Sequence, residues 1–188
     1  MKILLTLFVL LFSSSVFAED ISDFEIEGMS VGDSLLEYFS EDNIKQHIEP
    51  GYFQYKKDNK FITVELVALN SFKLYNAVQA QVKVNDNKYI IYGLGGMIDY
   101  IYNIEDCYSK QNKVVEEILL VVSNVSINEQ GVRKSKSDST GKSTYTGIYL
   151  NFSNGDYIAI TCYDWSKEIG HIDHLRISMI TKKLGDWL

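Results

Sequence analysis

The sequence predicts an α+β fold in which helices pack on one face of an antiparallel sheet, with one long central helix over about residues 104–122. Three observations lead to this prediction. Two blocks of alternating apolar and polar residues, about 50–97 and 144–182, are typical of strands with one buried face. Apolar residues at helical spacing separate the two blocks. Helix-capping residues precede the first block, so the order is helices, strands, one helix, strands.

Composition limits the size and the class of the protein. A chain of 188 residues fits one domain, and its 46% hydrophobic and 23% charged residues indicate a globular chain. We expect a single domain over residues 19–188; alternatively, two small β-blocks are joined by the helix. A net charge of −7 argues against nucleic-acid binding. Two cysteines and three histidines leave little for a metal site, and no cofactor is expected.

The first eighteen residues have the pattern of a secretory signal peptide. Lys2 precedes an apolar run over 3–12, and Val16 and Ala18 occupy the −3 and −1 positions of a cleavage site. We therefore expect export, with a periplasmic or secreted protein after cleavage near Ala18. The alternative, a membrane anchor, needs about 20 apolar residues. No later window is long enough, so we expect no membrane span in the mature chain.

Short helices are expected before the first strands. Ser30 and Asp33 resemble a capping box at the start of one helix. Ser40 is placed to cap a second helix over 41–48, and Pro50 ends it. Period-2 alternation then predicts strands over 52–57, 61–68, 74–84 and 89–93.

The helix over 104–122 begins after Asn103, a good N-cap residue. Its apolar stripe consists of Ile104, Cys107, Tyr108, Val115, Ile118, Leu119 and Val122. Residues 128–143 are polar without a strong pattern, which indicates a mobile loop. Asn154-Gly155 is a hairpin signal between two alternating runs. The remaining strands are expected over 144–152, 156–164 and 174–181.

The two cysteines are predicted to form a disulfide. Cys107 lies on the apolar stripe of the helix, and Cys162 alternates with Ile158 and Ile160 on the apolar face of a strand. Both thiols then point into one interface, and an exported protein meets an oxidising compartment. The alternative is two separate buried thiols. No Cys-x-x-Cys spacing indicates a redox pair.

Two glycine-containing motifs carry little chemical information. Thr140-Gly141-Lys142-Ser143 matches the end of a phosphate-binding loop, but the expected preceding glycine is replaced by Lys136. Gly93-Leu94-Gly95-Gly96 matches part of a dinucleotide fingerprint, but the third glycine is replaced by Ile98. We expect the second motif to be a strand that bulges or turns. No Gly-x-Ser-x-Gly elbow is present, so no catalytic residue is assigned.

Three neighbouring residues, His171, Asp173 and His174, are weak candidates for metal ligands. On a strand His171 and His174 face opposite sides, whereas on a turn they converge. One functional hypothesis is therefore a small secreted hydrolase or metal-dependent enzyme. The alternative for these residues is a solvated surface loop.

The hypothesis favoured by the sequence is a non-enzymatic binding module of the cell envelope, with an envelope protein, a peptide or a glycan as partner. Aromatic residues alternate on two neighbouring strands, opposite the predicted core face. If exposed, these rings form one patch of the kind that marks a binding surface. Alternatively, residues 19–55 cover them. The candidate ligand-binding residues are Tyr145, Tyr149, Tyr157, Tyr163 and Trp165.

Two stretches carry a resemblance to known proteins. Residues 24–36 and 138–143, with Cys162-Tyr163-Asp164-Trp165 and the Cys107 helix, resemble a group of small uncharacterised exported bacterial proteins. That resemblance implies export and no particular activity. More distantly, Gly28-Met29-Ser30 is similar to the start of the first short helix in outer-membrane assembly lipoproteins and β-lactamase-inhibitor-like modules. It implies two short helices before an antiparallel sheet.

Overall fold

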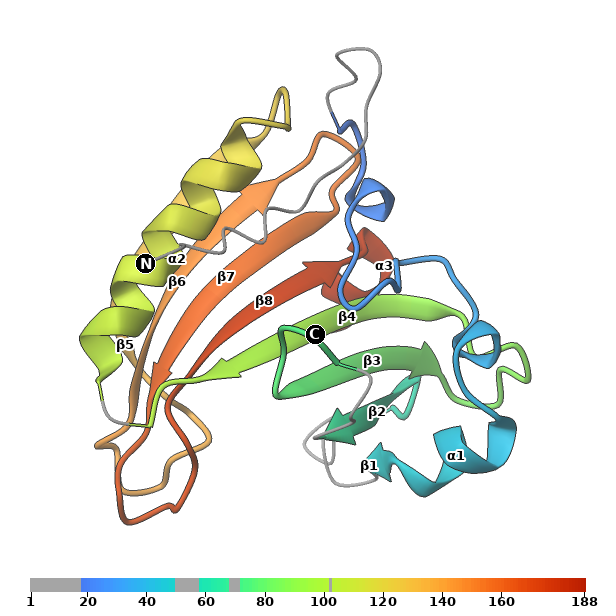
Figure 1. Ribbon diagram of the computed structural model, residues 1–188, viewed down its shortest axis with the longest axis horizontal. Helices are drawn as coiled ribbons and strands as arrows, with labels where there is room; N and C mark the ends of the chain where they lie inside the picture. The colour runs from blue at the N-terminus through green and yellow to red at the C-terminus, as the bar shows by residue number, and fades with distance from the viewer. Residues whose placement is uncertain (1–17, 50–57, 68–71, 102) are drawn as a thin grey trace, which may run out of the picture.

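The computed structural model describes residues 18–49, 58–67, 72–101 and 103–188 (Figure 1). One antiparallel sheet of eight strands, in the order β1-β2-β3-β4-β8-β7-β6-β5, dominates it. The strands are β1 Ile48–Glu49, β2 Phe61–Val67, β3 Ala77–Lys83, β4 Ile91–Asp99, β5 Ser126–Lys134, β6 Thr144–Asn151, β7 Tyr157–Asp164 and β8 His174–Ile180. The helices are η1 Ile21–Asp23 and η2 Leu35–Glu37, both 3₁₀, and α1 Glu41–Gln46, α2 Ile104–Leu119 and α3 Lys182–Gly185.

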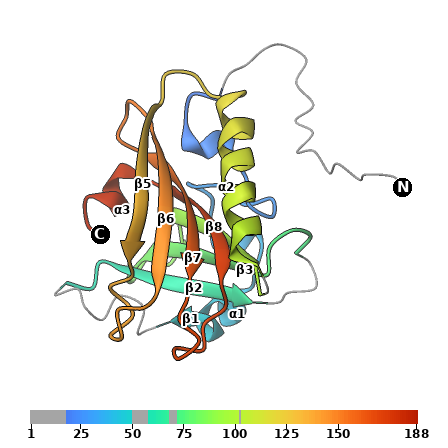
Figure 2. The ribbon, with the colours of Figure 1, turned by 90° about the vertical axis from the view of Figure 1, so that its left-hand side faces the viewer.

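The fold class predicted from the sequence is wrong. The described chain is mostly sheet with three short α-helices, and it has no long central helix. The helix that replaces it, α2, ends at Leu119 and lies to one side of the sheet, beside β7 and β8 (Figures 1 and 2). The prediction failed because it gave too little of the chain to the sheet: the polar residues taken as a mobile loop over 128–143 contain most of β5.

The sheet joins the two predicted β-blocks without a break. Strand β4 of the first block pairs with β8 of the second, with Leu94 opposite Met179 and Ile98 opposite Leu175. Because side chains alternate along each strand, these pairs define one side of the sheet, which we call the core face. Ile158, Ile160 and Cys162 of β7 belong to it. The other side is called the outer face.

A single core covers the core face. It is formed by the N-terminal segment, residues 18–49, and by α2; Figure 1 shows that segment in blue. Glu27 links the segment to the chain just before β3, because its carboxylate accepts hydrogen bonds from the backbone N–H groups of Lys73, Leu74 and Tyr75 at 2.8–3.0 Å. Fully buried members of the core include Ile21, Met29, Leu35, Leu66, Leu94, Cys107, Ile158 and Leu175.

The predicted helix after Ser30 is absent, although part of its capping pattern is present. The Asp33 carboxylate accepts a hydrogen bond from the Ser30 N–H at 2.8 Å. Gly32 follows with φ 98°, a left-handed conformation that stops a right-handed helix. Only the 3₁₀ turn η2 forms, capped by Ser34. The second predicted helix is confirmed as α1, with Ser40 as its N-cap.

Most predicted strands are confirmed. Those over 61–68, 74–84, 144–152, 156–164 and 174–181 correspond to β2, β3, β6, β7 and β8 within a few residues at each end. The strand expected over 89–93 corresponds to β4, which continues to Asp99. The strand predicted over 52–57 lies outside the described residues.

The glycines of β4 make room for neighbours on both faces of the sheet. A Cβ atom on Gly96 would overlap the Tyr75 ring, and one on Gly93 would overlap Leu184 of α3. Gly93-Leu94-Gly95-Gly96 therefore runs through the strand and opens no nucleotide-binding turn. Close packing explains the glycines, as expected when other groups approach a strand closely.

Candidate functional site

The candidate site is a cluster of aromatic side chains on the outer face, which we call the ring surface. Its rings come from β6, β7 and the residue that follows β7, because these strands alternate between core and outer residues. Tyr145 lies directly opposite Tyr163 in the strand register, and Tyr157 lies opposite Asn151. The five predicted residues that form the ring surface are Tyr145, Tyr149, Tyr157, Tyr163 and Trp165.

The ring contacts form two neighbouring groups, one of Tyr145, Tyr163 and Trp165 and one of Tyr149 and Tyr157. Ring centroids are 5.8 Å apart for Tyr145 and Tyr163 and 6.1 Å apart for Tyr149 and Tyr157. The rings of Tyr163 and Trp165 are almost parallel, with centroids 5.5 Å apart and planes 6° apart. Each of the five side chains is partly exposed. The described residues 18–49, which were the alternative cover for these rings, pack on the opposite face of the sheet.

Tyr149 leans along its own strand instead of standing away from the sheet. A Cβ atom on Gly147 would lie 2.8 Å from Cε2 and 3.2 Å from the hydroxyl oxygen of Tyr149. The absence of a side chain at Gly147 therefore makes room for the Tyr149 ring. Tyr157 lies similarly close to Gly185 of α3, where a Cβ would be 2.9 Å from Cε1. The Tyr149 ring therefore lies low on the sheet, whereas the Tyr157 ring packs against α3.

The surroundings keep these phenols protonated at neutral pH. Burial raises the pKa of Tyr149 to about 12, and the neighbouring Tyr163, Tyr145 and Tyr157 add to the shift. Burial also raises the pKa of Tyr157. A protonated phenol both donates and accepts hydrogen bonds.

Two histidines extend the ring surface. The sequence did not predict their contacts with the rings. His174 is paired with Tyr163 in the register of β7 and β8, and their ring centroids are 4.9 Å apart. The His171 ring meets the edge of Trp165 at 4.8 Å. Burial lowers the pKa of His174, although its hydrogen bond to the Ile172 carbonyl opposes the shift.

The structure gives the weak metal-ligand candidates other contacts. Oδ1 of Asp173 accepts a hydrogen bond from the Trp165 backbone N–H at 2.6 Å, and so fixes the turn that carries the indole. His171 and His174 contact the aromatic rings. In the described ranges, no three or more His, Cys, Asp or Glu side chains are grouped so as to hold a metal ion.

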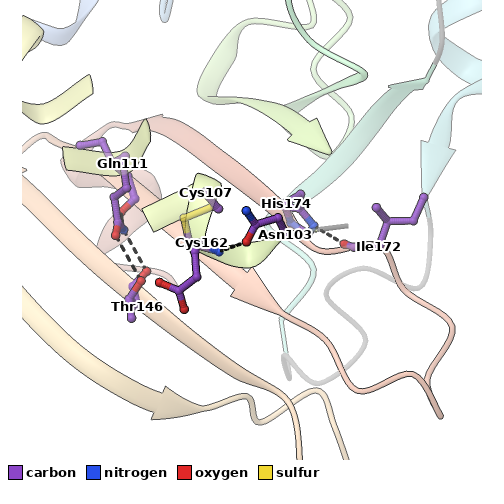
Figure 3. Close-up of a disulfide and its surroundings, with 9 residues drawn as sticks. Asn103, Cys107, Gln111, Thr146, Cys162, Ile172 and His174 are labelled. Carbon is purple, nitrogen blue, oxygen red and sulfur yellow. Dashed lines mark hydrogen bonds between the residues drawn. A yellow bond between two sulfur atoms is a disulfide. The ribbon is translucent and has the colours of Figure 1, made fainter. Parts of the chain in front are cut away.

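A disulfide on the core face holds α2 against strand β7, on the opposite side of the sheet from the rings. The predicted bond between Cys107 of α2 and Cys162 of β7 is confirmed (Figure 3). Cys162 lies on the core face, and the next residue, Tyr163, lies on the ring surface. The crosslink therefore holds α2 against the strand that carries two of the rings.

Gln111 adds a polar link between α2 and the sheet. Its Nε2 donates to the carbonyls of Thr146 and Ile160 at 3.1 and 2.7 Å, and its Oε1 accepts from the Thr146 hydroxyl at 3.2 Å (Figure 3). The side chain is buried. The sequence did not predict this role of Gln111, although Gln111 lies four residues after Cys107, at a position of the helical stripe where an apolar residue is expected.

The connection between β5 and β6 is folded around a buried carboxylate. Asp138 accepts hydrogen bonds from the backbone N–H groups of Thr140, Lys142 and Ser143 and from the Ser143 hydroxyl, at 2.7–3.1 Å. Burial favours the neutral acid, but these hydrogen bonds outweigh it and hold the pKa of Asp138 well below its usual value. The N–H groups of the phosphate-loop-like motif are thus used by Asp138.

The same connection supports the turn beside Trp165. The Ser143 hydroxyl accepts a hydrogen bond from the Ser166 N–H at 2.9 Å. The turn is held from two directions, since Asp173 binds the backbone of Trp165 itself. The turn that carries Trp165 is therefore held in place by two hydrogen bonds.

Comparisons with protein-family profiles, curated proteins and solved structures found no match to this chain. The disulfide fits an exported protein, because such bonds form and persist in oxidising compartments. In the parts of the chain that the structure describes, no helix is both long and apolar enough to cross a membrane. The predicted signal peptide, apart from Ala18, lies outside the described residues.

Proposed function

We propose that this protein is an exported, non-enzymatic binding module of the bacterial envelope and that its ring surface binds a glycan. The observation that carries the proposal is the gathering of five partly exposed aromatic rings on the outer face. The Tyr149 ring lies close over Gly147 and contacts Tyr157, and Tyr145, Tyr163 and Trp165 form the neighbouring group. Such a row of aromatic faces suits a ligand that is itself flat.

Sugar rings have this property. They present C–H groups on their faces and hydroxyl groups at their edges, and aromatic side chains combine apolar area with a polar group. The protonated phenols of Tyr149 and Tyr157 are able to donate to, or accept from, sugar hydroxyls.

The length of the ring surface favours an oligosaccharide over a single sugar. Tyr145 and Tyr149 are four residues apart on β6, which corresponds to about 13 Å along a strand. The cluster continues past Tyr163 to Trp165 at its end. A chain of several sugars would therefore contact all of these rings at once.

Protein partners also use tyrosine and tryptophan anchors, but the neighbouring sheet edge disfavours a partner that adds a strand. The adjacent edge strand, β5, carries Glu129, Arg133 and Lys134, and its register shifts between Gln130 and Arg133. Charges and bulges on an edge strand oppose pairing with another chain. The geometry therefore favours a ligand lying on the rings.

Export is the second part of the proposal, with cleavage near Ala18. It is supported by the signal-like first eighteen residues, by the disulfide and by the resemblance to small exported proteins. After cleavage following Ala18, the N–H groups of Glu19 and Asp20 would keep their hydrogen bonds to Asp23. The intact mass of protein recovered from the periplasm tests the cleavage site. A mass that includes the first eighteen residues would contradict export by cleavage.

Binding is tested by isothermal titration with chitohexaose, cellohexaose and maltohexaose, and by sedimentation with purified peptidoglycan. We expect at least one of these glycans to bind and Tyr149→Ala or Trp165→Ala to weaken it about tenfold, the loss of one stacking contact of about 1.4 kcal/mol. Tyr38→Ala is the matched control, because Tyr38 is also exposed but lies outside the ring surface.

Two results would contradict the glycan proposal. In one, none of the four glycan preparations binds to the wild-type protein. In the other, a protein from the native envelope is captured in stoichiometric amounts, and Trp165→Ala abolishes its capture. The second result would assign the ring surface to a protein partner.

A further inference from the structure

A pocket on the outer face contains none of the ring-surface residues. The C-terminal helix α3 and the chain before β2 enclose, with the end of β3, a pocket of about 510 Å³. That volume is within the range of small-molecule sites, roughly 300–1,000 Å³. One wall is apolar and consists of Phe61, Val84 and Trp187. The cations are Lys60, Lys83 and Lys183.

Two of these cations converge on one aromatic ring. The Nζ atoms of Lys83 and Lys183 lie 4.8 and 5.2 Å from the centroid of the Tyr92 ring. They come from different elements, β3 and α3, and the fold brings them together. Because the two positive charges repel each other, the arrangement favours an anion that binds both.

Neither lysine has a carboxylate partner in the described residues. The ion pairs there join Lys60 to Asp58 and Lys182 to Asp186, the acidic residue that also lines the pocket. Asp86 attracts Lys83 from a greater distance and raises its pKa slightly, after contacts with Lys183 and Tyr92. The two neighbouring ammonium groups are thus a local concentration of positive charge in a chain whose net charge is −7.

The apolar wall is fixed in place. The indole Nε1 of Trp187 donates to Asp58 Oδ1 at 2.8 Å, and the Trp187 ring lies 5.2 Å from that of Phe61. The Phe61 ring in turn meets Tyr92 edge-on at 5.4 Å. Packed aromatic rings therefore stand beside the converging ammonium groups, and they provide area for a non-polar or ring-shaped group.

We propose that this pocket binds a phosphate or sulfate oxyanion carried on a small organic body, with Lys83 and Lys183 holding the oxyanion and Trp187 contacting the body. Lysine binds phosphate as a point charge, and two ammonium groups match a dianion better than one. The site is independent of the ring surface, and its test has no glycan arm.

The probes are sodium phosphate and phenyl phosphate, each added at constant ionic strength maintained with sodium chloride. Binding is followed by the fluorescence of Trp187 in a Trp165→Phe background and by ¹⁵N-detected NMR of the lysine amino groups. We expect saturable binding of both probes, with phenyl phosphate at least about threefold tighter. The neighbouring Lys83 lowers the pKa of Lys183, so bound phosphate is expected to raise the pKa of Lys183.

Variants localise the effect. Lys83→Gln combined with Lys183→Gln is expected to weaken phenyl phosphate binding more than tenfold. Lys113→Gln is the matched control, since Lys113 is an exposed lysine on α2 that does not line the pocket. Circular dichroism and the melting temperature of each variant establish that it folds, and the NMR titration of the wild-type protein provides a measurement that needs no substitution.

Three outcomes overturn the proposal or part of it. The pocket is not an oxyanion site if neither probe binds better than chloride, or if the control variant loses as much affinity as the double variant. Equal affinity for the two probes would remove the organic body from the proposal. Lysine NMR shifts on addition of phosphate that exclude Lys83 and Lys183 would assign the binding elsewhere.

Discussion

Loss of the Cys107–Cys162 disulfide is expected to destabilise the protein strongly. The two cysteines are 55 residues apart in the sequence, and closing a loop of that length in the unfolded chain corresponds to about 4 kcal/mol. A domain of this size loses roughly 2–4 °C in Tm per kcal/mol. We therefore expect Tm to fall by roughly 8–16 °C when the bond is broken.

The assay is thermal and urea unfolding of the wild-type protein, Cys107→Ala, Cys162→Ala and the double variant. Each single variant breaks the same bond. The two single variants and the double variant should therefore lose similar free energy of unfolding, and the losses of the single variants should not add up in the double variant. Reduced wild-type protein keeps both sulfur atoms and isolates the crosslink from the loss of packing. A loss of less than about 1 kcal/mol on reduction, or single variants that add up to the double, would refute the reasoning.

Three further substitutions test the packing and the buried polar groups. Gln111→Leu removes the hydrogen bonds from α2 to β6 and β7, and the free energy of unfolding is expected to fall by about 1–3 kcal/mol in urea titrations; an unchanged value would count against that role. Gly96→Ala places a methyl group against the Tyr75 ring and is expected to lower the free energy of unfolding by about 1–3 kcal/mol. Gly131→Ala, where a Cβ meets nothing within 4 Å, should lower it far less. Equal losses in the two variants would contradict the packing explanation. Asp138→Asn removes a carboxylate whose pKa is lowered in the folded protein, so its stabilisation is complete above the unfolded pKa of about 4 and is lost as the pH falls through the folded pKa. The difference in Tm between wild type and Asp138→Asn should therefore be full at pH 6 and narrow towards pH 2, and a difference that grows on acidification would contradict the sign.

The sequence predicted the disulfide because both cysteines follow clear periodic patterns. Cys107 lies on a helical stripe and Cys162 on an alternating strand, and burial of the two apolar faces brings them together. The five ring residues were predicted by the same alternation, since inward and outward positions on β6 and β7 follow directly from it.

Elements whose stability depends on distant partners were not predicted. Strand β5 is exposed along most of its length and has no apolar alternation, and its existence depends on the hydrogen bonds to β6. The helix expected after Ser30 fails at Gly32, where the chain takes a left-handed turn. Sequence patterns detect elements whose apolar residues repeat regularly along the chain. Neither β5 nor the segment after Ser30 is determined by such a repeat.

The two histidines at the ring surface and the pocket on the outer face were not predicted either, because both depend on contacts between distant parts of the chain. His171 and His174 reach the rings of Trp165 and Tyr163 through a turn whose shape depends on the Asp173 hydrogen bond. The pocket lined by Lys83 and Lys183 brings together residues 59–61, 83–85 and 183, 186 and 187 from three parts of the chain. No short-range spacing in the sequence indicates such a convergence.

Chemical-shift mapping of a bound oligosaccharide tests the ring surface most directly. The amide and aromatic signals of the ¹⁵N,¹³C-labelled protein would be followed while the tightest-binding hexasaccharide, or soluble peptidoglycan fragments, is added. We predict saturating shifts at Tyr145, Tyr149, Tyr157, Tyr163 and Trp165, with no saturating shifts in the N-terminal segment on the opposite face. Saturating shifts confined to that segment or to α2, or no shifts with any glycan, would contradict the account.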